Sequence, residues 1–208
     1  YSFSLTRDPL GRVTQKVENV GGVTTTYDYT YDTAGRLVDV DKNSAAYSEY
    51  VYNNNSNRTS RTISGVTVSS TSDNQDRMLT HGTLTFSHNQ NGERTQKSDS
   101  ASSPAAVTDY TYDVVGNLTR VDLPSTDYIE YLYDAFDRRS VRKVNGTIDR
   151  YYVYQSDLQI AAEYDSGYAL VARYVYASQS HVPDYVVKSG VNYRIVTDQI
   201  GSVRLVVR

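Results

Sequence analysis

The chain has 208 residues, of which 21 are basic and 24 are acidic, so its formal net charge is -3 at pH 7. These charges are interspersed without a basic patch or an acidic tail, which excludes an obvious nucleic-acid surface. Zero cysteines exclude a disulfide framework and a cysteine-based zinc site. No apolar run is long enough to cross a bilayer as a helix, so we expect no membrane span in this segment.

Tyrosine dominates the aromatic residues, with 21 Tyr against 3 Phe and no Trp. Its ring is apolar and its hydroxyl is polar, so tyrosine suits a sheet face that is half-buried and half-wet. Val and Thr are also abundant, and runs of Ala, Leu, Glu and Lys that would favour helix are absent. The composition predicts an all-β protein.

A Tyr-x-Tyr-Asp box recurs along the chain, often with glycine three residues after the aspartate. The clearest copies, in chain order, are YTYDTAGRL at Tyr29–Leu37, YVYNNNSNR at Tyr50–Arg58, YTYDVVGNL at Tyr110–Leu118 and YLYDAFDRR at Tyr131–Arg139. Weaker copies place the aspartate position at residues 8, 73, 89, 155, 177 and 198, so successive copies lie 16 to 24 residues apart and mostly close to 21. This period predicts one supersecondary unit per repeat.

The residues of these boxes form the structural motif that the sequence predicts. They are Tyr29, Tyr31, Asp32, Gly35, Tyr50, Tyr52, Tyr110, Tyr112, Asp113, Gly116, Tyr131, Tyr133, Asp134, Asp198 and Gly201. The glycine is expected to supply the left-handed residue of a turn, while the aspartate side chain caps a backbone N–H two residues on. Copies with Ser56 or Asp137 in place of glycine are predicted to form strained or differently shaped turns.

A second set of turn signals lies between the boxes. These dipeptides are Gly21-Gly22, Ser64-Gly65, His81-Gly82, Asn145-Gly146, Ser166-Gly167 and Ser189-Gly190. Two turns per repeat divide each repeat into two strands, which predicts tandem β-hairpins in a continuous spiralling antiparallel sheet. Tyrosine rings at equivalent positions are expected to stack in ladders across the sheet, and the Ser98–Val107 run is expected to protrude as a loop.

The segments YDTAGRL, YDVVGNLTRV and YRIVTDQIGSVRLVV resemble the YD repeats of the Rhs protein family, over nearly the whole chain. YD repeats also occur in the third component of insecticidal Tc toxins, in wall-associated bacterial proteins and in teneurins. The resemblance implies a sheet wound into a hollow cocoon around a C-terminal toxin.

In Rhs-like proteins the resemblance also implies a self-cleaving Asp-Pro-x-Gly-Leu motif, which follows a stretch similar to Thr197–Val207. That motif does not occur in this sequence. Autoproteolysis is therefore not assigned to Asp198, and Asp8-Pro9-Leu10-Gly11 predicts a turn.

The titratable residues form no catalytic or metal-binding pattern. The three histidines lie at no metal-ligand spacing. Asp39 and Asp41 imitate the start of a calcium loop, but Tyr50 occupies the position of the bidentate glutamate. We therefore expect no enzyme, no metal and no cofactor.

The sequence thus predicts a single array of about ten YD repeats over residues 1–208, an internal fragment of a larger exported bacterial protein. Its expected partners are the rest of its own parent chain, including an encapsulated C-terminal toxin domain, in a secreted or cell-surface location. The alternative is an adhesion array whose exposed tyrosine rings bind surface glycans.

Overall fold

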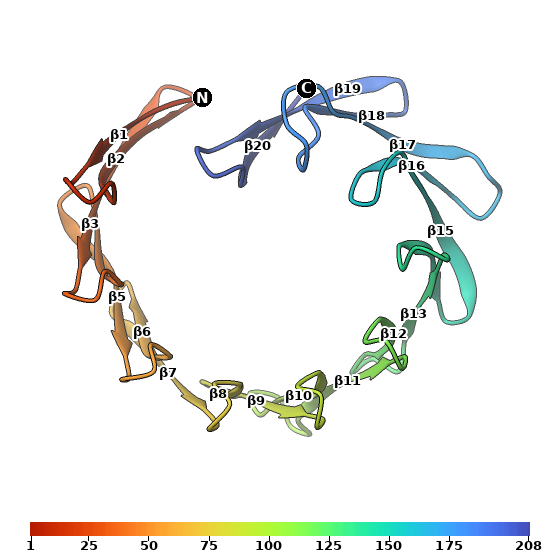
Figure 1. Cartoon of the computed structure of the whole chain (residues 1–208), viewed down its shortest axis with the longest axis horizontal. Helices are drawn as coiled ribbons and strands as arrows, with labels where there is room; N and C mark the ends of the chain where they lie inside the picture. The colour runs from red at the N-terminus through yellow and green to blue at the C-terminus, as the bar shows by residue number, and fades with distance from the viewer. The chain divides into compact units, whose positions relative to one another are not determined.

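The computed structural model describes all of residues 1–208 and consists of strands joined by turns and loops (Figure 1). The prediction of an all-β protein built from antiparallel hairpins is confirmed. The twenty strands are β1 (Ser2–Arg7), β2 (Val13–Val20), β3 (Val23–Tyr31), β4 (Leu37–Lys42), β5 (Ala45–Tyr52), β6 (Arg58–Ile63), β7 (Val66–Ser72), β8 (Met78–His81), β9 (Leu84–His88), β10 (Arg94–Asp99), β11 (Ala106–Tyr112), β12 (Leu118–Asp122), β13 (Tyr128–Tyr133), β14 (Arg139–Val144), β15 (Thr147–Tyr154), β16 (Ile160–Tyr164), β17 (Leu170–Val175), β18 (Tyr185–Lys188), β19 (Val191–Thr197) and β20 (Val203–Val207).

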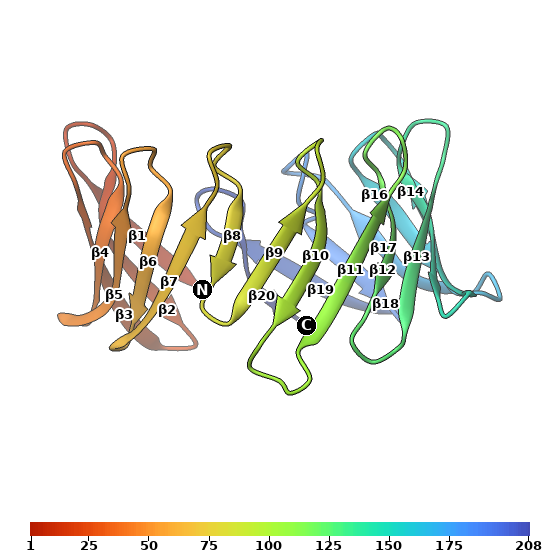
Figure 2. The same cartoon turned by 90° about the horizontal axis from the view of Figure 1, so that it is seen from below.

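The chain divides into two compact units, one of Tyr1–Ser87 with Ser98–Ala105 and one of His88–Lys97 with Ala106–Arg208. Within each unit, strands that follow one another in sequence pair antiparallel and lie side by side, as Figure 2 shows for β5 to β7. Strands contact their sequence neighbours and no second layer packs on them. Each unit is therefore a single layer of hairpins.

A single layer has little interior. The accessible surface is 13012 Å², whereas a compact globular protein of 23.3 kDa exposes about 9,700 Å². The buried apolar side chains are Val40, Val121, Ala162, Ala172 and Val186. Much of the stability must therefore come from contacts between adjacent strands and between adjacent turns.

Two-residue turns join the paired strands β2 and β3, and likewise β4 and β5. Between β2 and β3, Gly21 and Gly22 have φ angles of 58° and 87°. Positive φ at both residues is typical of type I′ turns, whose backbone twist matches that of the strands they join. Asn43 and Ser44 form a turn of the same kind between β4 and β5, with φ angles of 50° and 63°, although neither residue was predicted to do so.

The turn between β16 and β17 differs from the prediction. It runs from Asp165 to Ala169, and Tyr168 rather than Gly167 is left-handed, with φ of 63°. Asp165 Oδ1 accepts hydrogen bonds from the N–H groups of Gly167 and Ala169, both at 2.9 Å. A box-type turn has therefore replaced the predicted two-residue turn, because an aspartate stands in front of it.

Two connections differ from the prediction: the link from β17 to β18 is longer, and the loop between β10 and β11 is shorter. No box turn forms at Ala177, where the link from β17 to β18 is instead held by Asp184 Oδ2, which accepts from the N–H groups of Ala177 and Ser178 at 2.6 and 2.9 Å. The predicted Ser98–Val107 loop is shorter, because its two ends belong to β10 and β11 and residues 100–105 alone lie between strands.

Candidate functional site

The aspartate of the box closes its turn, and we name it the cap residue. In the turn between β3 and β4, Asp32 Oδ1 accepts a hydrogen bond from the N–H of Arg36 at 2.9 Å. The N–H of Gly35 donates to the carbonyl of Asp32 at 3.0 Å, and Gly35 has φ of 80°. The position three residues after the cap is therefore the left-handed residue of the turn, which glycine adopts without steric cost. The same arrangement is found at Asp113 with Gly116 and at Asp198 with Gly201.

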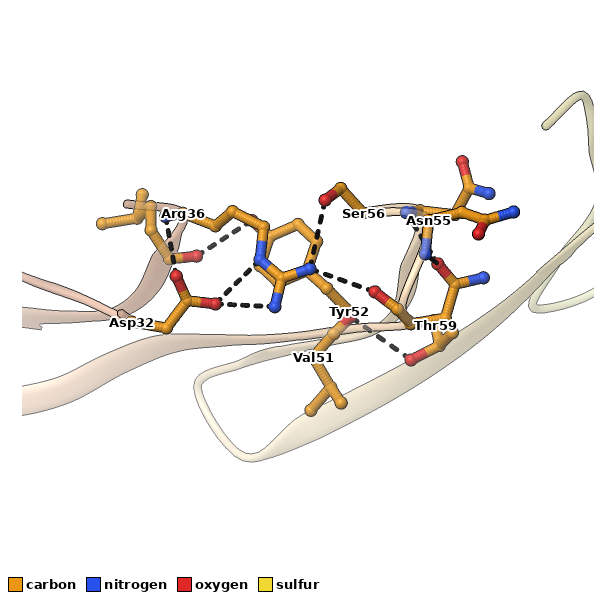
Figure 3. Close-up of polar contacts among 10 residues, drawn as sticks. Asp32, Arg36, Val51, Tyr52, Asn55, Ser56 and Thr59 are labelled. Carbon is orange, nitrogen blue, oxygen red and sulfur yellow. Dashed lines mark hydrogen bonds and ion pairs between the residues drawn. The ribbon is translucent and has the colours of Figure 1, made fainter. Parts of the chain in front are cut away.

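Four residues after the cap lies the bridging residue, which connects one repeat to the next (Figure 3). Arg36 Nε donates to Asp32 Oδ2 at 2.7 Å. Its Nη1 donates to the carbonyl of Asn53 at 3.0 Å and to Ser56 Oγ at 3.2 Å, both in the following turn. Its guanidinium carbon lies 4.9 Å from the ring centroid of Tyr52. One arginine thus joins its own cap to the turn and the tyrosine of the next repeat.

The same bridge recurs with other side chains. Asn117 Nδ2 donates to its own cap Asp113 at 3.1 Å and to Asp137 of the next turn at 3.3 Å. Asn57 Nδ2 donates to Asp76 of the next turn at 2.5 Å. Arginine also pairs with the cap of its own turn at 2.7 to 2.8 Å in Asp8–Arg12, Asp73–Arg77 and Asp134–Arg138.

Polar residues at the left-handed position keep the shape of the turn, so of the two predicted alternatives, strain or a different shape, the structure shows strain. Ser56, Asp76 and Asp137 have φ angles of 67°, 62° and 57°. Their N–H groups donate to the carbonyl of the cap at 3.0 to 3.1 Å, as the N–H of Gly35 does. The predicted strain is present, because L-residues are disfavoured in this region. Each side chain accepts a hydrogen bond from the preceding bridging residue, which offsets that strain.

The second tyrosine of the box adds another contact between repeats. Its hydroxyl donates to a backbone carbonyl 15 to 18 residues earlier, at 2.7 to 3.0 Å. The accepting carbonyl always belongs to the residue five positions after the preceding cap, which we name the flanking residue. The pairs are Tyr31 with Val13, Tyr52 with Leu37, Tyr133 with Leu118, and Tyr154 with Arg139.

The box tyrosines do not form the predicted ring-on-ring ladders. Ring pairs are found at Tyr1–Phe3, Tyr27–Tyr47 and Tyr151–Tyr168, and none of these pairs joins boxes of neighbouring repeats. Guanidinium groups contact the second box tyrosines instead, with Arg12 4.8 Å from the centroid of Tyr31 and Arg138 5.1 Å from that of Tyr154. Each such contact contributes about 0.5–1 kcal/mol at an exposed site.

The first tyrosine of the box lies within a strand and is half-buried. The cross-strand pairs are Tyr29 with Val40, Tyr50 with Arg61, Tyr110 with Val121, and Tyr131 with Arg142. Tyr112 is the last residue of β11 and pairs with Leu118, and burial raises the pKa of its hydroxyl. Within each unit, the predicted motif residues therefore lie in the box turns and in the strands that end at them.

Hydrogen bonds to the cap carboxylates make the free energy of unfolding depend on pH in the acidic range. The pKa of Asp32 lies below its ordinary value of 3.8, first because the N–H of Arg36 donates to it. The pKa of Asp134 is lowered chiefly by the guanidinium of Arg138. A carboxyl whose folded pKa is depressed stabilises the fold above its unfolded pKa, and that contribution is lost as the pH falls through the folded value. We expect the urea midpoint to fall as the pH drops below about 4.

The matched control for this acid effect comes from the chain itself, because Asn53 and Asn89 are natural neutral caps. The variant Asp32→Asn with Asp134→Asn should show a shallower loss of urea midpoint in acid than the wild type. Parallel curves for the two proteins would show that the caps do not cause the acid sensitivity.

Removing one tyrosine hydroxyl tests the contact between repeats. Tyr52→Phe deletes the hydrogen bond to the carbonyl of Leu37 at 2.9 Å and should lower the free energy of unfolding by about 1 kcal/mol. Tyr50→Phe is the control, because Tyr50 contacts Arg58 through its ring, at 5.7 Å. Urea denaturation should separate the two variants, and equal losses would contradict the role of the Tyr52 hydroxyl.

No group of three or more His, Cys, Asp or Glu side chains is arranged to hold a metal ion. The structure contains no helix with the length and hydropathy needed to cross a bilayer. Asp8 caps an ordinary box turn, with its Oδ1 accepting from the N–H groups of Leu10 and Arg12 at 3.0 and 2.9 Å.

Box, cap and bridge recur over the whole length of the sequence, and the profile of one family, Teneurin YD-shell, matches residues 1–208. The chain belongs to the Teneurin YD-shell family. The resemblance of its repeats to YD repeats is thereby confirmed. No curated protein matches the sequence.

Solved structures similar to this YD-shell segment are those of Tc toxin complexes. The crystal structure of TcdB2-TccC3-TEV has a TM-score of 0.42 and 13% identity, covering 97% of this chain and 11% of that one. For TcdB2-TccC3 the values are 0.42, 12%, 97% and 11%. For the Photorhabdus luminescens Tc holotoxin pore they are 0.40, 12%, 96% and 15%. This YD-shell segment therefore spans 11 to 15% of the length of these chains.

The bridging residues were not predicted from the sequence. Their signal is the residue that follows the left-handed position in the boxes, as in the pairs GR, SN, GN and DR. The pairing of the left-handed residue with the preceding bridging residue, as of Asp137 with Asn117, was not predicted either. Both features belong to pairs of repeats, so they are not visible when each box is considered alone.

Proposed function

We propose that this chain is a non-catalytic segment of the wall of a YD-repeat shell, and that the shell encloses a C-terminal toxin of a secreted polymorphic toxin protein. The proposal rests on the bridge from Arg36 to the next turn and on its counterpart from Asn117 to Asp137. These contacts join hairpin to hairpin within each unit, and a wall that must resist opening needs such contacts.

The uncovered faces also support a wall. Strands contact their neighbours in sequence, and the accessible surface of 13012 Å² exceeds that of a compact protein of this mass. A single layer with two open faces suits a partition between an enclosed space and the solvent. Membership of the YD-shell family agrees with a structural rather than a catalytic role.

Protection from protease tests this function in the product of the complete open reading frame. We expect intact mass and gel analysis to show a C-terminal piece that resists protease while the shell is folded. The piece should become digestible once the shell is unfolded in urea. Digestion of that piece at the same rate before and after unfolding would contradict enclosure.

A second candidate function is binding of surface glycans, which one pair of rings favours. Tyr151 and Tyr168 are stacked, with centroids 4.9 Å apart and an interplanar angle of 14°. Tyr168 holds the left-handed position of its turn and is 72% exposed. A flat exposed ring can stack on the apolar face of a sugar. A glycan array with Tyr168→Ala as the negative control tests this candidate.

The proposed location is extracellular, either secreted or on the surface of a bacterial cell. A sheet with no cysteine needs no oxidising compartment for its stability, so the cysteine content does not indicate a location. The proposed location therefore rests on the proposed shell function. Fractionation of cells that express the complete protein tests it, and retention in the cytoplasm under every growth condition would contradict it.

A further inference from the structure

The flanking residue, five positions after the cap, is apolar in most repeats and lies across from the second box position. The apolar examples are Val13, Leu37, Met78, Leu118, Ile160 and Val203. Arginine replaces them at Arg58, Arg94 and Arg139, and Arg58 and Arg139 pair across from Tyr52 and Tyr133. A cation has therefore been placed where the repeat otherwise holds an aliphatic side chain.

Arg139 is half-buried and has no carboxylate partner. Its guanidinium carbon lies 3.9 Å from the ring centroid of Tyr131, and its Nε is buried without a hydrogen-bond partner. Neighbouring arginines in the same unit do have carboxylate partners: Arg138 pairs with Asp134, and Arg142 pairs with Asp149. Because a half-buried cation without an anion is costly, a partner that supplies a negative charge would be favoured here.

A pocket of about 320 Å³ opens beside Arg139 and is lined by Tyr133, Arg139, Tyr152, Tyr154 and Ile160. All five residues belong to β13–β16, inside one unit. Burial raises the pKa of Tyr152 and of Tyr154, so both hydroxyls stay protonated and neutral. The pocket thus combines one cation with tyrosine rings and an aliphatic wall.

We propose that this pocket binds the carboxylate of an acidic side chain, glutamate or aspartate, from a polypeptide that lies on this face of the sheet. Arg139 would pair with the carboxylate, and the rings of Tyr133 and Tyr152 would contact the aliphatic stem. This inference rests on the proposed shell function, because an enclosed polypeptide is the partner that such a face would meet. One arginine among aromatic rings suits a single carboxylate better than the row of phosphates in a nucleic acid, which requires several cations.

The experiment measures binding of a fluorescein-labelled peptide of alternating glutamate and leucine by anisotropy, with a glutamine–leucine peptide as the matched probe. Arg139→Gln should weaken binding of the glutamate peptide at least tenfold, while Arg139→Lys, which keeps the charge, should lose less. Arg173→Gln is the control, because Arg173 is exposed and pairs across from Ala162 and Val187. Tyr152 and Tyr174 lie in the neighbouring cross-strand rows, so their side chains point to the opposite face of the sheet from Arg173. Urea midpoints of all variants establish that each is folded.

Three results would overturn the inference: equal binding by Arg139→Gln and the wild type, equal affinity for the glutamine peptide, or no saturable binding at all. Displacement of the peptide by poly(U) RNA at lower concentration than by free glutamate peptide would assign the site to phosphate instead. Peptide binding does not depend on protease protection of the C-terminal piece. Loss of one with retention of the other therefore distinguishes failure of this site from failure of the shell function.

Discussion

Replacing Lys16 by methionine should lower the free energy of unfolding by about 3–5 kcal/mol, because it removes one half of a buried ion pair. Lys16 Nζ lies 3.2 Å from Glu18 Oε1, and the two side chains are 11% and 5% exposed. The hydroxyl of Tyr1 donates to the same carboxylate oxygen at 2.9 Å. Once the ammonium is gone, the carboxylate of Glu18 keeps its desolvation cost without the charge that offsets it.

Two further variants identify the cause of that loss. The double variant Lys16→Met with Glu18→Met removes both charges and should recover most of the stability, to within about 1 kcal/mol of the wild type. Lys42→Met is the matched control, because Lys42 lies 5.5 Å from the ring of Tyr47 much as Lys16 lies 4.9 Å from that of Tyr27, but in no carboxylate ion pair. Urea denaturation measures all three. A double variant as unstable as the single one would show that the methionine side chain, and not the unpaired charge, causes the loss of stability.

The strands and turns of the box were accessible from the sequence because they depend on neighbours a few residues apart. A Tyr-x-Tyr alternation places both rings on one face, and aspartate with glycine three residues later specifies a turn with a left-handed residue. The turn at Asp165 escaped this logic, because Ser166-Gly167 competes as a turn signal. There the capping bonds of Asp165 to Gly167 and Ala169 decide the outcome.

The predicted stacking of box tyrosine rings is not found, for a geometric reason. Box strands are not adjacent: β4 lies between β3 and β5, and β14 between β13 and β15. Two strand spacings amount to about 9.5 Å, which exceeds the 4.5–7 Å of favourable ring pairs. A guanidinium fits this gap, as the contact of Arg36 with Tyr52 shows. Side-chain spacing along one strand therefore cannot predict contacts across a hairpin.

The contacts between turns could not be predicted from single boxes either. Arg36 and Ser56 are 20 residues apart, as are Asn117 and Asp137, and their approach depends on the register of the strands between them. That register shifts at each box hairpin, for example between Thr30 and Tyr31. A bulge is not encoded by hydrophobic alternation, so the sequence predicts which residues recur but not which of them meet.

Arg36→Ala should lower the free energy of unfolding by about 3 kcal/mol, the largest effect expected at a bridging residue. The variant removes two hydrogen bonds from a charged donor, to the Asn53 carbonyl and the Ser56 hydroxyl, together worth about 2 kcal/mol. It also removes the contact with the ring of Tyr52, worth about 0.5–1 kcal/mol. The exposed part of the ion pair with Asp32 adds little, because solvent screens it.

The shape of the guanidinium, and not its charge alone, should carry this effect. Lysine cannot donate to Asp32, Asn53 and Ser56 together with the planar fork of arginine, so Arg36→Lys should recover less than half of the loss. Arg7→Ala is the control, because Arg7 Nη1 donates to Gly11 at 2.6 Å within a single turn; it should cost less than about 1 kcal/mol. Urea denaturation compares the three variants. If Arg36→Ala were no worse than Arg7→Ala, contacts between turns would add nothing to the sheet, and the stability of each hairpin would have to come from its strand pairing alone.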